Sequence, residues 1–287
     1  MASKYHVRSI SLPSRSHPTT LRIEEEINRL KTAEAISQYS ASESICAGLS
    51  GLEDLYQCMD DLLNMPSTQQ VLSQNQHEKC IDQLLDGSVR LLDICGIARD
   101  YMFQIKEHVQ ALQSALRRRK GDSSIESSIL HYYSFRKEMK KQAKKLITEL
   151  KQFDNKVGAS PLQNQDHHFS AVIRVLREVN VMNACIFQSL FSFLSAPVSS
   201  KQAKWSLVSK LMHKGVVSCE EKQEVVNELE KVDAALCKHT SDVDKIKIAH
   251  ERLVALENSI QGLENRLEFV FRHLIKARTS LLNIISH

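Results

Sequence analysis

Apolar residues recur every three or four positions through most of this 287-residue chain. Because an α-helix has about 3.6 residues per turn, this spacing places the apolar side chains along one side of a helix. No long stretch shows the alternation of apolar and polar residues that is typical of strands. The pattern therefore predicts an all-α protein, with helices at about 21–37, 52–65, 67–119, 123–157, 167–195 and 225–284 and a short helix around Trp205.

Side chains at the expected helix ends support these limits. Thr20 and Ser67 are predicted N-caps, because a hydroxyl oxygen can accept a hydrogen bond from the free N–H groups of the first turn. Asp166 is predicted to cap the next-to-last long helix, which explains the two histidines after it better than a catalytic role does. Gly121 is a predicted stop, because glycine readily ends a helix.

The last predicted helix carries the most regular pattern, in which spacings of four and three alternate and a single histidine interrupts the apolar series. A heptad series of this length predicts a long, coiled-coil-like helix that packs along its length. Its partner is either the rest of the chain, in an elongated bundle, or a second copy in a homodimer; the bundle is favoured, because the upstream helices also need a surface to cover. The sequence KHTSD at 238–242 indicates a break. The series consists of Val225, Leu229, Val232, Leu236, His239, Val243, Ile246, Ala249, Leu253, Leu256, Ile260, Leu263, Leu267, Val270, Leu274, Ala277, Leu281 and Ile284.

The first twenty residues differ from the rest of the chain. They hold three basic residues, no acidic residue, five serines and two prolines. Such a composition cannot bury a core, so we expect residues 1–20 to form a disordered arm and residues 21–287 to form the helical bundle.

Within this arm, the sequence RSISLP at 8–13 has the spacing Arg–Ser–x–Ser–x–Pro. Kinases that prefer basic substrates recognise an arginine three residues before the acceptor, which makes Ser11 the predicted phosphorylation site. With Arg8, Ser9 and Pro13, the phosphorylated segment resembles the peptides that 14-3-3 adaptors bind through an arginine cluster. The alternative is an organelle transit peptide, because those segments are also rich in serine and arginine and poor in acids.

Charge is distributed unevenly along the bundle. Residues 116–151 have a net charge of +7, whereas residues 21–100 have −8 and residues 219–268 have −5. The most basic helix has an apolar stripe of Phe135, Met139, Ala143, Leu146, Leu150 and Phe153, beside Arg136, Lys137, Lys140, Lys141, Lys144 and Lys145. One interpretation is that this basic face is exposed to solvent and that the acidic helices of the bundle balance its charge. The other is that it binds anionic membranes or calmodulin. Nucleic-acid binding is disfavoured, because no reading motif or interleaved aromatic residues accompany the lysines.

The sequence carries little that indicates catalysis. The seven cysteines are scattered without a CxxC pair and are typical of reduced, buried thiols in an intracellular protein. His77 and Cys80 have the spacing of two metal ligands, but no second pair accompanies them, so no metal or other cofactor is expected. No phosphate-binding glycine loop, nucleophile motif or metalloprotease motif is present, which disfavours an enzyme. No secretory signal or apolar run of membrane-spanning length occurs, so we expect a cytoplasmic or peripheral protein.

Several longer segments resemble one known family. They are HVRSISLPSRSHP, GLSGLEDLYQCMDDLLNMPSTQQVL, LLDGSVRLLDICGIARD, LQSALRRRKG and LENRLEFVFRHLIKARTSLLNIISH. Together they are similar to a plant-specific helical family, long catalogued only as a domain of unknown function and related to the BYPASS proteins. The resemblance implies a plant source, a non-enzymatic protein and a role in root and shoot development, and it supplies no catalytic or ligand residues. Because the N-terminal strip belongs to the family pattern, a discarded transit peptide is disfavoured, and the chloroplast is a minor alternative.

The expected function is therefore protein–protein interaction in plant development, regulated through phosphorylation of the arm. The alternative is a peripheral membrane protein that docks on anionic lipid through the basic helix at 135–153.

Overall fold

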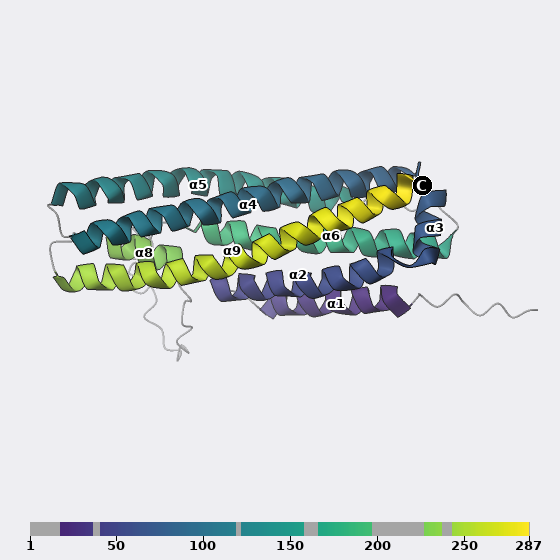
Figure 1. The fold of residues 1–287 in the computed structure, drawn as a ribbon, viewed down its shortest axis with the longest axis horizontal. Helices are drawn as coiled ribbons and strands as arrows, with labels where there is room; N and C mark the ends of the chain where they lie inside the picture. Colours follow the sequence, from purple (N-terminus) through teal and green to yellow (C-terminus); the bar gives the residue numbers. More distant parts are fainter. Residues whose placement is uncertain are drawn as a thin grey trace, which may run out of the picture.

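The computed structural model describes residues 18–36, 41–118, 122–157, 166–196, 227–236 and 243–286, which form eight α-helices and no strand. The helices pack as an elongated bundle, which confirms the expected fold class (Figure 1). They are α1 (Pro18–Ile36), α2 (Ser42–Leu63), α3 (Pro66–Gln74), α4 (Lys79–Arg118), α5 (Asp122–Val157), α6 (His167–Leu194), α8 (Glu228–Leu236) and α9 (Val243–Ser286).

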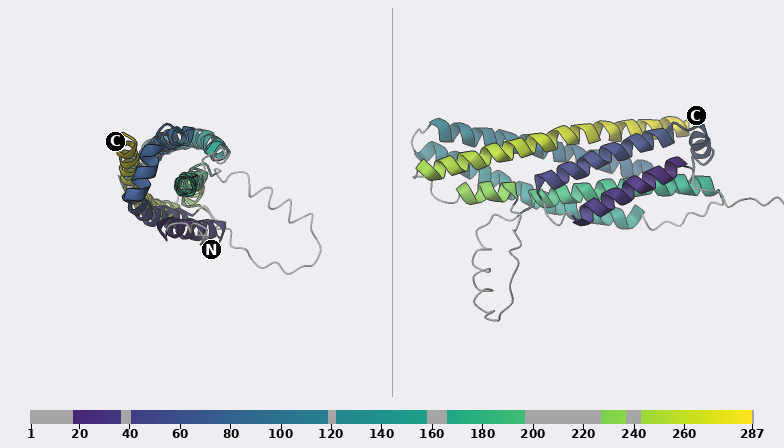
Figure 2. Two further views of the ribbon diagram at one scale, coloured as in Figure 1. Left: turned by 90° about the vertical axis from the view of Figure 1, so that its right-hand side faces the viewer. Right: turned by 90° about the horizontal axis from the view of Figure 1, so that it is seen from below.

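Helix α6 forms the centre of the bundle. It packs against α1, α2, α4 and α5, and the end-on view in Figure 2 shows the other helices curving around it. Its apolar side chains are buried on several sides, among them Phe169, Phe187, Phe191 and Phe193. Each large apolar side chain that is buried in this way stabilises the fold by about 2 kcal/mol, which makes α6 a main source of the core energy.

The long C-terminal helix packs within the chain. Helix α9 lies against α2, α3, α4 and α8, and every heptad position from Ala249 to Ile284 is buried. The apolar positions of α8 at Leu229, Val232 and Leu236 are buried as well. The intramolecular interpretation of the heptads is therefore confirmed, and a homodimer through the same positions would have to displace these contacts.

Three predicted helix starts are wrong. The helix predicted from residue 52 begins ten residues earlier, at Ser42, so Gly48 and Gly51 both lie within α2. Helix α1 begins at Pro18, so Thr20 lies inside the helix, fully buried, and is not an N-cap. The N-cap of α3 is Met65, and Pro66 takes the first helical position, where the missing N–H costs no hydrogen bond. Ser67 therefore caps nothing.

The single helix predicted for 67–119 is divided into α3 and α4. The side chain of Asn75 donates a hydrogen bond of 2.8 Å to the carbonyl of Val71, and the turn that follows ends α3 before α4 begins at Lys79. The limits of α5 and α6 agree with the prediction, and the Asp166 carboxylate accepts hydrogen bonds from the N–H groups of His168 and Phe169. The expected helix around Trp205, the break at 238–242 and the stop at Gly121 lie outside the described residues.

A close approach of α1 and α2 depends on a glycine. A methyl group placed on Gly51 would overlap the side chain of Leu30, which is buried. Gly48, on the same helix, has room for a methyl group, because the nearest atoms of Ile186 would be 3.5 Å away. The absence of a side chain at Gly51 therefore allows α1 to pack tightly onto α2.

Candidate functional site

Among the residues that the structure describes, the largest fully buried side chain is that of Arg136, a charged residue on α5 that is 2% exposed. A guanidinium without a partner in such a place would be very costly, because it loses its hydration. Its partner is Asp233 on α8, which is 0% exposed. The Nη2 atom of Arg136 lies 2.9 Å from the Oδ2 atom of Asp233, so the two charges form a buried ion pair.

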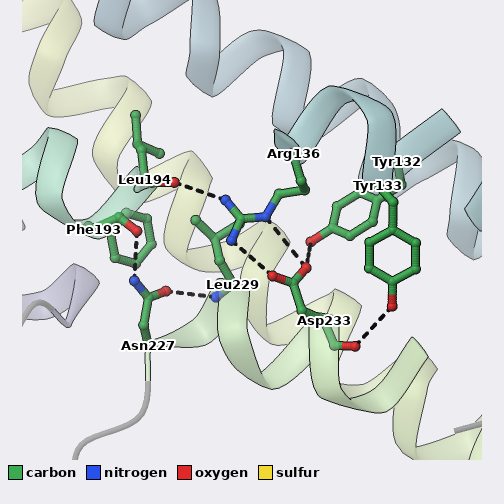
Figure 3. A network of polar contacts seen from close by, with 8 residues as sticks. All are labelled: Tyr132, Tyr133, Arg136, Phe193, Leu194, Asn227, Leu229 and Asp233. Atoms are coloured by element: carbon green, nitrogen blue, oxygen red, sulfur yellow. Dashed lines mark hydrogen bonds and ion pairs between the residues drawn. The ribbon is translucent and has the colours of Figure 1, made fainter. Parts of the chain in front are cut away.

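Further hydrogen bonds surround this ion pair (Figure 3). The Tyr132 hydroxyl donates to the Oδ1 atom of Asp233 at 2.8 Å, and the Tyr133 hydroxyl donates to the backbone carbonyl of Asp233 at 3.1 Å. The Nη1 atom of Arg136 donates to the Leu194 carbonyl at 3.0 Å. That carbonyl belongs to the last turn of α6, where the helix dipole favours a positive charge.

Asn227 extends the network to the start of α8. Its side-chain nitrogen donates to the Phe193 carbonyl at 2.8 Å, and its side-chain oxygen accepts from the N–H of Leu229 at 2.8 Å. Asn227 therefore joins the last turn of α6 to the first turn of α8. We call Tyr132, Tyr133, Arg136, Asn227 and Asp233 the Arg136 network; it connects α5, α6 and α8.

The ionisation of nearby groups reflects their burial. Burial and the Asp233 carboxylate raise the pKa of Tyr132 well above its usual value, so this hydroxyl remains a neutral donor. Burial also raises the pKa of Glu230 and lowers the pKa of Lys140, where Lys144 and Arg136 add to the effect. The Arg136 network is thus a structural connection whose donors and acceptors are used within the chain.

Sequence reasoning placed Arg136 on the basic surface, and the structure places it in the core. Arg136 follows Tyr132 by four positions and precedes Met139 by three, and both neighbours are buried. Asp233 likewise lies on the buried side of α8, four positions after Leu229 and three before Leu236. Each of the two helices thus has one charged residue among its buried apolar positions. This was the signal that could have indicated the Arg136–Asp233 ion pair.

The predicted lysines behave differently from Arg136. Lys137, Lys141, Lys144 and Lys145 are exposed, and Lys140 is half-buried. The apolar stripe beside them faces the bundle: Met139, Ala143, Leu146 and Leu150 are buried, and Phe135 stacks on His108 at a ring distance of 4.4 Å. The side chain of Phe153 lies outside the described part of the chain. Helix α5 therefore presents its charges to solvent and its apolar stripe to the core.

The predicted phosphorylation motif of Arg8, Ser9, Ser11 and Pro13 lies outside the described residues, just before α1. Among the residues that the structure describes, no three His, Cys, Asp or Glu side chains are arranged to hold a metal ion, and His77 and Cys80 have no further ligand beside them. No described helix is both long and apolar enough to cross a bilayer.

A small cavity lies between α2, α4, α6 and α9. Its polar lining includes Ser88, Asn180 and Arg278, and its volume is about 20 Å³. This is room for about one water molecule. The cavity is too small for a metabolite or a cofactor.

Comparison with known proteins identifies the family. No curated protein and no solved structure matches the chain. A family model described as Protein BPS1 matches residues 48–284, which include Arg136, Asp233 and all of the helices from α3 to α8. Because this match covers most of the 287 residues, the chain belongs to the BPS1 family, as its sequence motifs predict.

Proposed function

We propose that this protein acts in plant root and shoot development by binding other proteins, and that phosphorylation of its N-terminal arm regulates this binding. Membership in the BPS1 family implies a plant developmental protein, and the family is not a known family of enzymes. Protein binding and its regulation by phosphorylation are proposed here as the way in which the protein acts in development.

The packing of the interior supports a binding role. The buried charges of Arg136 and Asp233 are paired with each other, and the cavity beside Arg278 has room for about one water molecule. A substrate would need a larger space lined by free polar groups. This cavity of the described helices therefore does not fit a substrate, which favours recognition through the outer surface and the arm.

The arm is the part of the chain best suited to regulation. Phosphorylation of Ser11 would add almost two negative charges, about 1.5 to 2 at neutral pH, next to Arg8. A 14-3-3 type adaptor holds such a phosphate with an arginine cluster, and Pro13 directs the chain out of the groove. The arm is joined directly to α1, whose Ile23 and Ile27 are fully buried, so an adaptor that grips the arm also holds the bundle.

The test is a titration of peptide 4–18 against a purified 14-3-3 adaptor, followed by the same titration with the full chain. We expect phosphate on Ser11 to tighten binding at least tenfold, which corresponds to about 1.4 kcal/mol, because charge-assisted bonds supply most of the energy. The matched control is the same peptide with phosphate on Ser9, which has the same charge at the wrong spacing. Equal binding by the Ser11-phosphorylated and unmodified forms would contradict the mechanism.

A second candidate is docking on anionic lipid through α5. Lys137, Lys141 and Lys144 are exposed and form no ion pair with any described residue, which favours an anionic contact. Because the apolar stripe of α5 is buried, this contact would be electrostatic, at about 1 kcal/mol for each lysine near the surface. Co-sedimentation with phosphatidylserine vesicles at low and high salt tests it. Binding that salt abolishes would support this candidate, and no binding at low salt would contradict it.

A further inference from the structure

Apolar side chains occur on the outer surface where α4 and α9 lie side by side. We call it the α4–α9 face: Val89, Leu92, Gly96 and Phe103 on α4, with Phe271, Ile275 and Leu282 on α9. Phe103 is 55% exposed and Ile275 is 45% exposed, and exposed apolar side chains that lie together mark candidate interaction surfaces. Figure 1 shows α4 and α9 as neighbours, with no other helix in front of them.

Contacts between the two helices show their relative direction and level. The guanidinium of Arg99 lies 4.4 Å from the ring centre of Phe271, and Arg99 also pairs with Glu268. Farther along, Arg278 donates to the Ser88 hydroxyl at 2.7 Å. The helices therefore run antiparallel, so Leu92 lies at about the level of Ile275. Leu92 and Phe271 are partly buried and pack against the core, so they anchor this surface on the bundle.

The two edges of this face carry opposite charges. The exposed residues of α4 between 86 and 107 include four acids, Asp86, Asp93, Asp100 and Glu107, and one base, Arg90. The exposed residues of α9 between 265 and 283 include three bases, Arg266, Arg272 and Lys276. Within the chain, Arg272 pairs with Glu268 and Lys276 pairs with Asp60 of α2, so a partner's acids would share these bases. The four acids of α4 form no ion pair with the described residues, so they are available to a partner.

We propose that the α4–α9 face binds a second copy of this chain. A twofold axis parallel to the helices would place α4 of one protomer against α9 of its partner. Residues keep their level along such an axis, so Asp93 would face the partner's Arg272 and the apolar side chains would meet between the charged edges. The face is thus complementary to itself in charge, as an isologous interface must be.

The size of the face fits a dimer that dissociates readily. Residues 85–103 of α4 span about 27 Å, and two helices side by side are about 20 Å wide, so each protomer contributes roughly 500 Å². Stable interfaces bury at least about 600 Å² on each partner, so this face lies near the lower end of the range. This interface is separate from the heptad positions of α9, which remain packed within each chain.

Sedimentation velocity of the full chain over a range of concentrations tests the proposal. We expect the mass to rise from 32.6 kDa to twice that value as the concentration increases. The double variant Val89→Glu/Ile275→Glu should weaken association at least tenfold. The matched control is Leu130→Glu on α5, which changes an exposed apolar residue outside the face and should leave association unchanged.

Charge reversal tests the arrangement of the two copies. Asp93→Lys/Asp100→Lys and Arg272→Glu should each be monomeric when alone, and a mixture of the two should form heterodimers, because each reversed edge then meets its complement. A parent chain that stays monomeric at high concentration would overturn the proposal. So would a dimer that survives Val89→Glu/Ile275→Glu, or reversed chains that do not pair when mixed although thermal melts show them folded.

Discussion

Replacement of Asp233 by alanine tests whether the Arg136 network holds α8 on the bundle. The change removes the ion pair at 2.9 Å and the acceptor of the Tyr132 hydroxyl at 2.8 Å, and it leaves the guanidinium of Arg136 buried with the Leu194 carbonyl as its remaining partner. A buried charge that loses its partner destabilises a protein by about 3 to 5 kcal/mol. We therefore expect Asp233→Ala to be one of the most destabilising single changes in the chain.

The assay is urea unfolding followed by circular dichroism. With a slope of about 3 kcal/mol per molar urea, a loss of about 4 kcal/mol lowers the midpoint by about 1.3 M. The matched control is Asp61→Ala, which removes an Arg–Asp ion pair whose side chains are 59% and 61% exposed. Exposed pairs contribute about 0.2 to 1 kcal/mol, so this midpoint should fall by about 0.3 M or less.

The double variant Arg136→Met/Asp233→Leu separates the cost of an unpaired charge from the value of the pair. Because it removes both charges and fills the space with apolar groups, it should recover most of the stability lost in Asp233→Ala. Equal midpoints for Asp233→Ala and Asp61→Ala would refute the reasoning, and so would a double variant that is no more stable than Asp233→Ala.

Three further predictions concern packing and surface charge. Leu256→Asp should cost several kcal/mol in a thermal melt because it buries an unpaired charge, whereas Val254→Asp, at a 37% exposed position of the same helix, should cost much less; overlaid melts would contradict this. Gly51→Ala should cost about 1 to 3 kcal/mol because the methyl group displaces Leu30, whereas Gly48→Ala should stabilise α2 by up to about 1 kcal/mol; the opposite order in urea unfolding would show that α1 can shift. The four exposed lysines of the basic face are Lys137, Lys141, Lys144 and Lys145. A chain with glutamate at all four positions should keep its helix content in circular dichroism, and a large loss would show that acidic groups of the bundle stabilise these lysines.

The long helix α9 could be predicted from the sequence because an apolar residue at each heptad position is itself the sign that this position is buried. Eleven of these positions, from Ala249 to Ile284, are buried, and the regular spacing depends on nothing outside the helix. The start of α6 was predictable for a similar reason, since the cap at Asp166 uses N–H groups only two and three residues away. Local chemistry decides both features.

The Arg136 network could not be predicted in the same way. Arg136 and Asp233 are separated by 97 positions in the chain, and neither helix shows which charge lies opposite. A general rule that arginine belongs on the polar side of a helix therefore placed Arg136 beside the lysines. The start of α3 was mispredicted for a different reason, because a proline can either follow the end of one helix or begin the next, as Pro66 does. The division of 67–119 was missed because the turn at Asn75 involves a side-chain hydrogen bond that the apolar spacing does not show.

The structure shows how the positive charge of the basic helix α5 is distributed between the interior and the surface. An internal match of its charge by the acidic helices was one interpretation of the sequence, and the structure provides it chiefly at Arg136. Among the other described basic residues of the helix, Lys145 pairs with Glu149 on the same exposed surface, at 3.7 Å. Acidic residues of α9 form ion pairs with α4 instead, between Glu264 and Lys106 and between Glu268 and Arg99. Positive charge on α5 is thus left for solvent, where it can steer anionic groups toward this side of the bundle. Association that depends on it should weaken as salt rises.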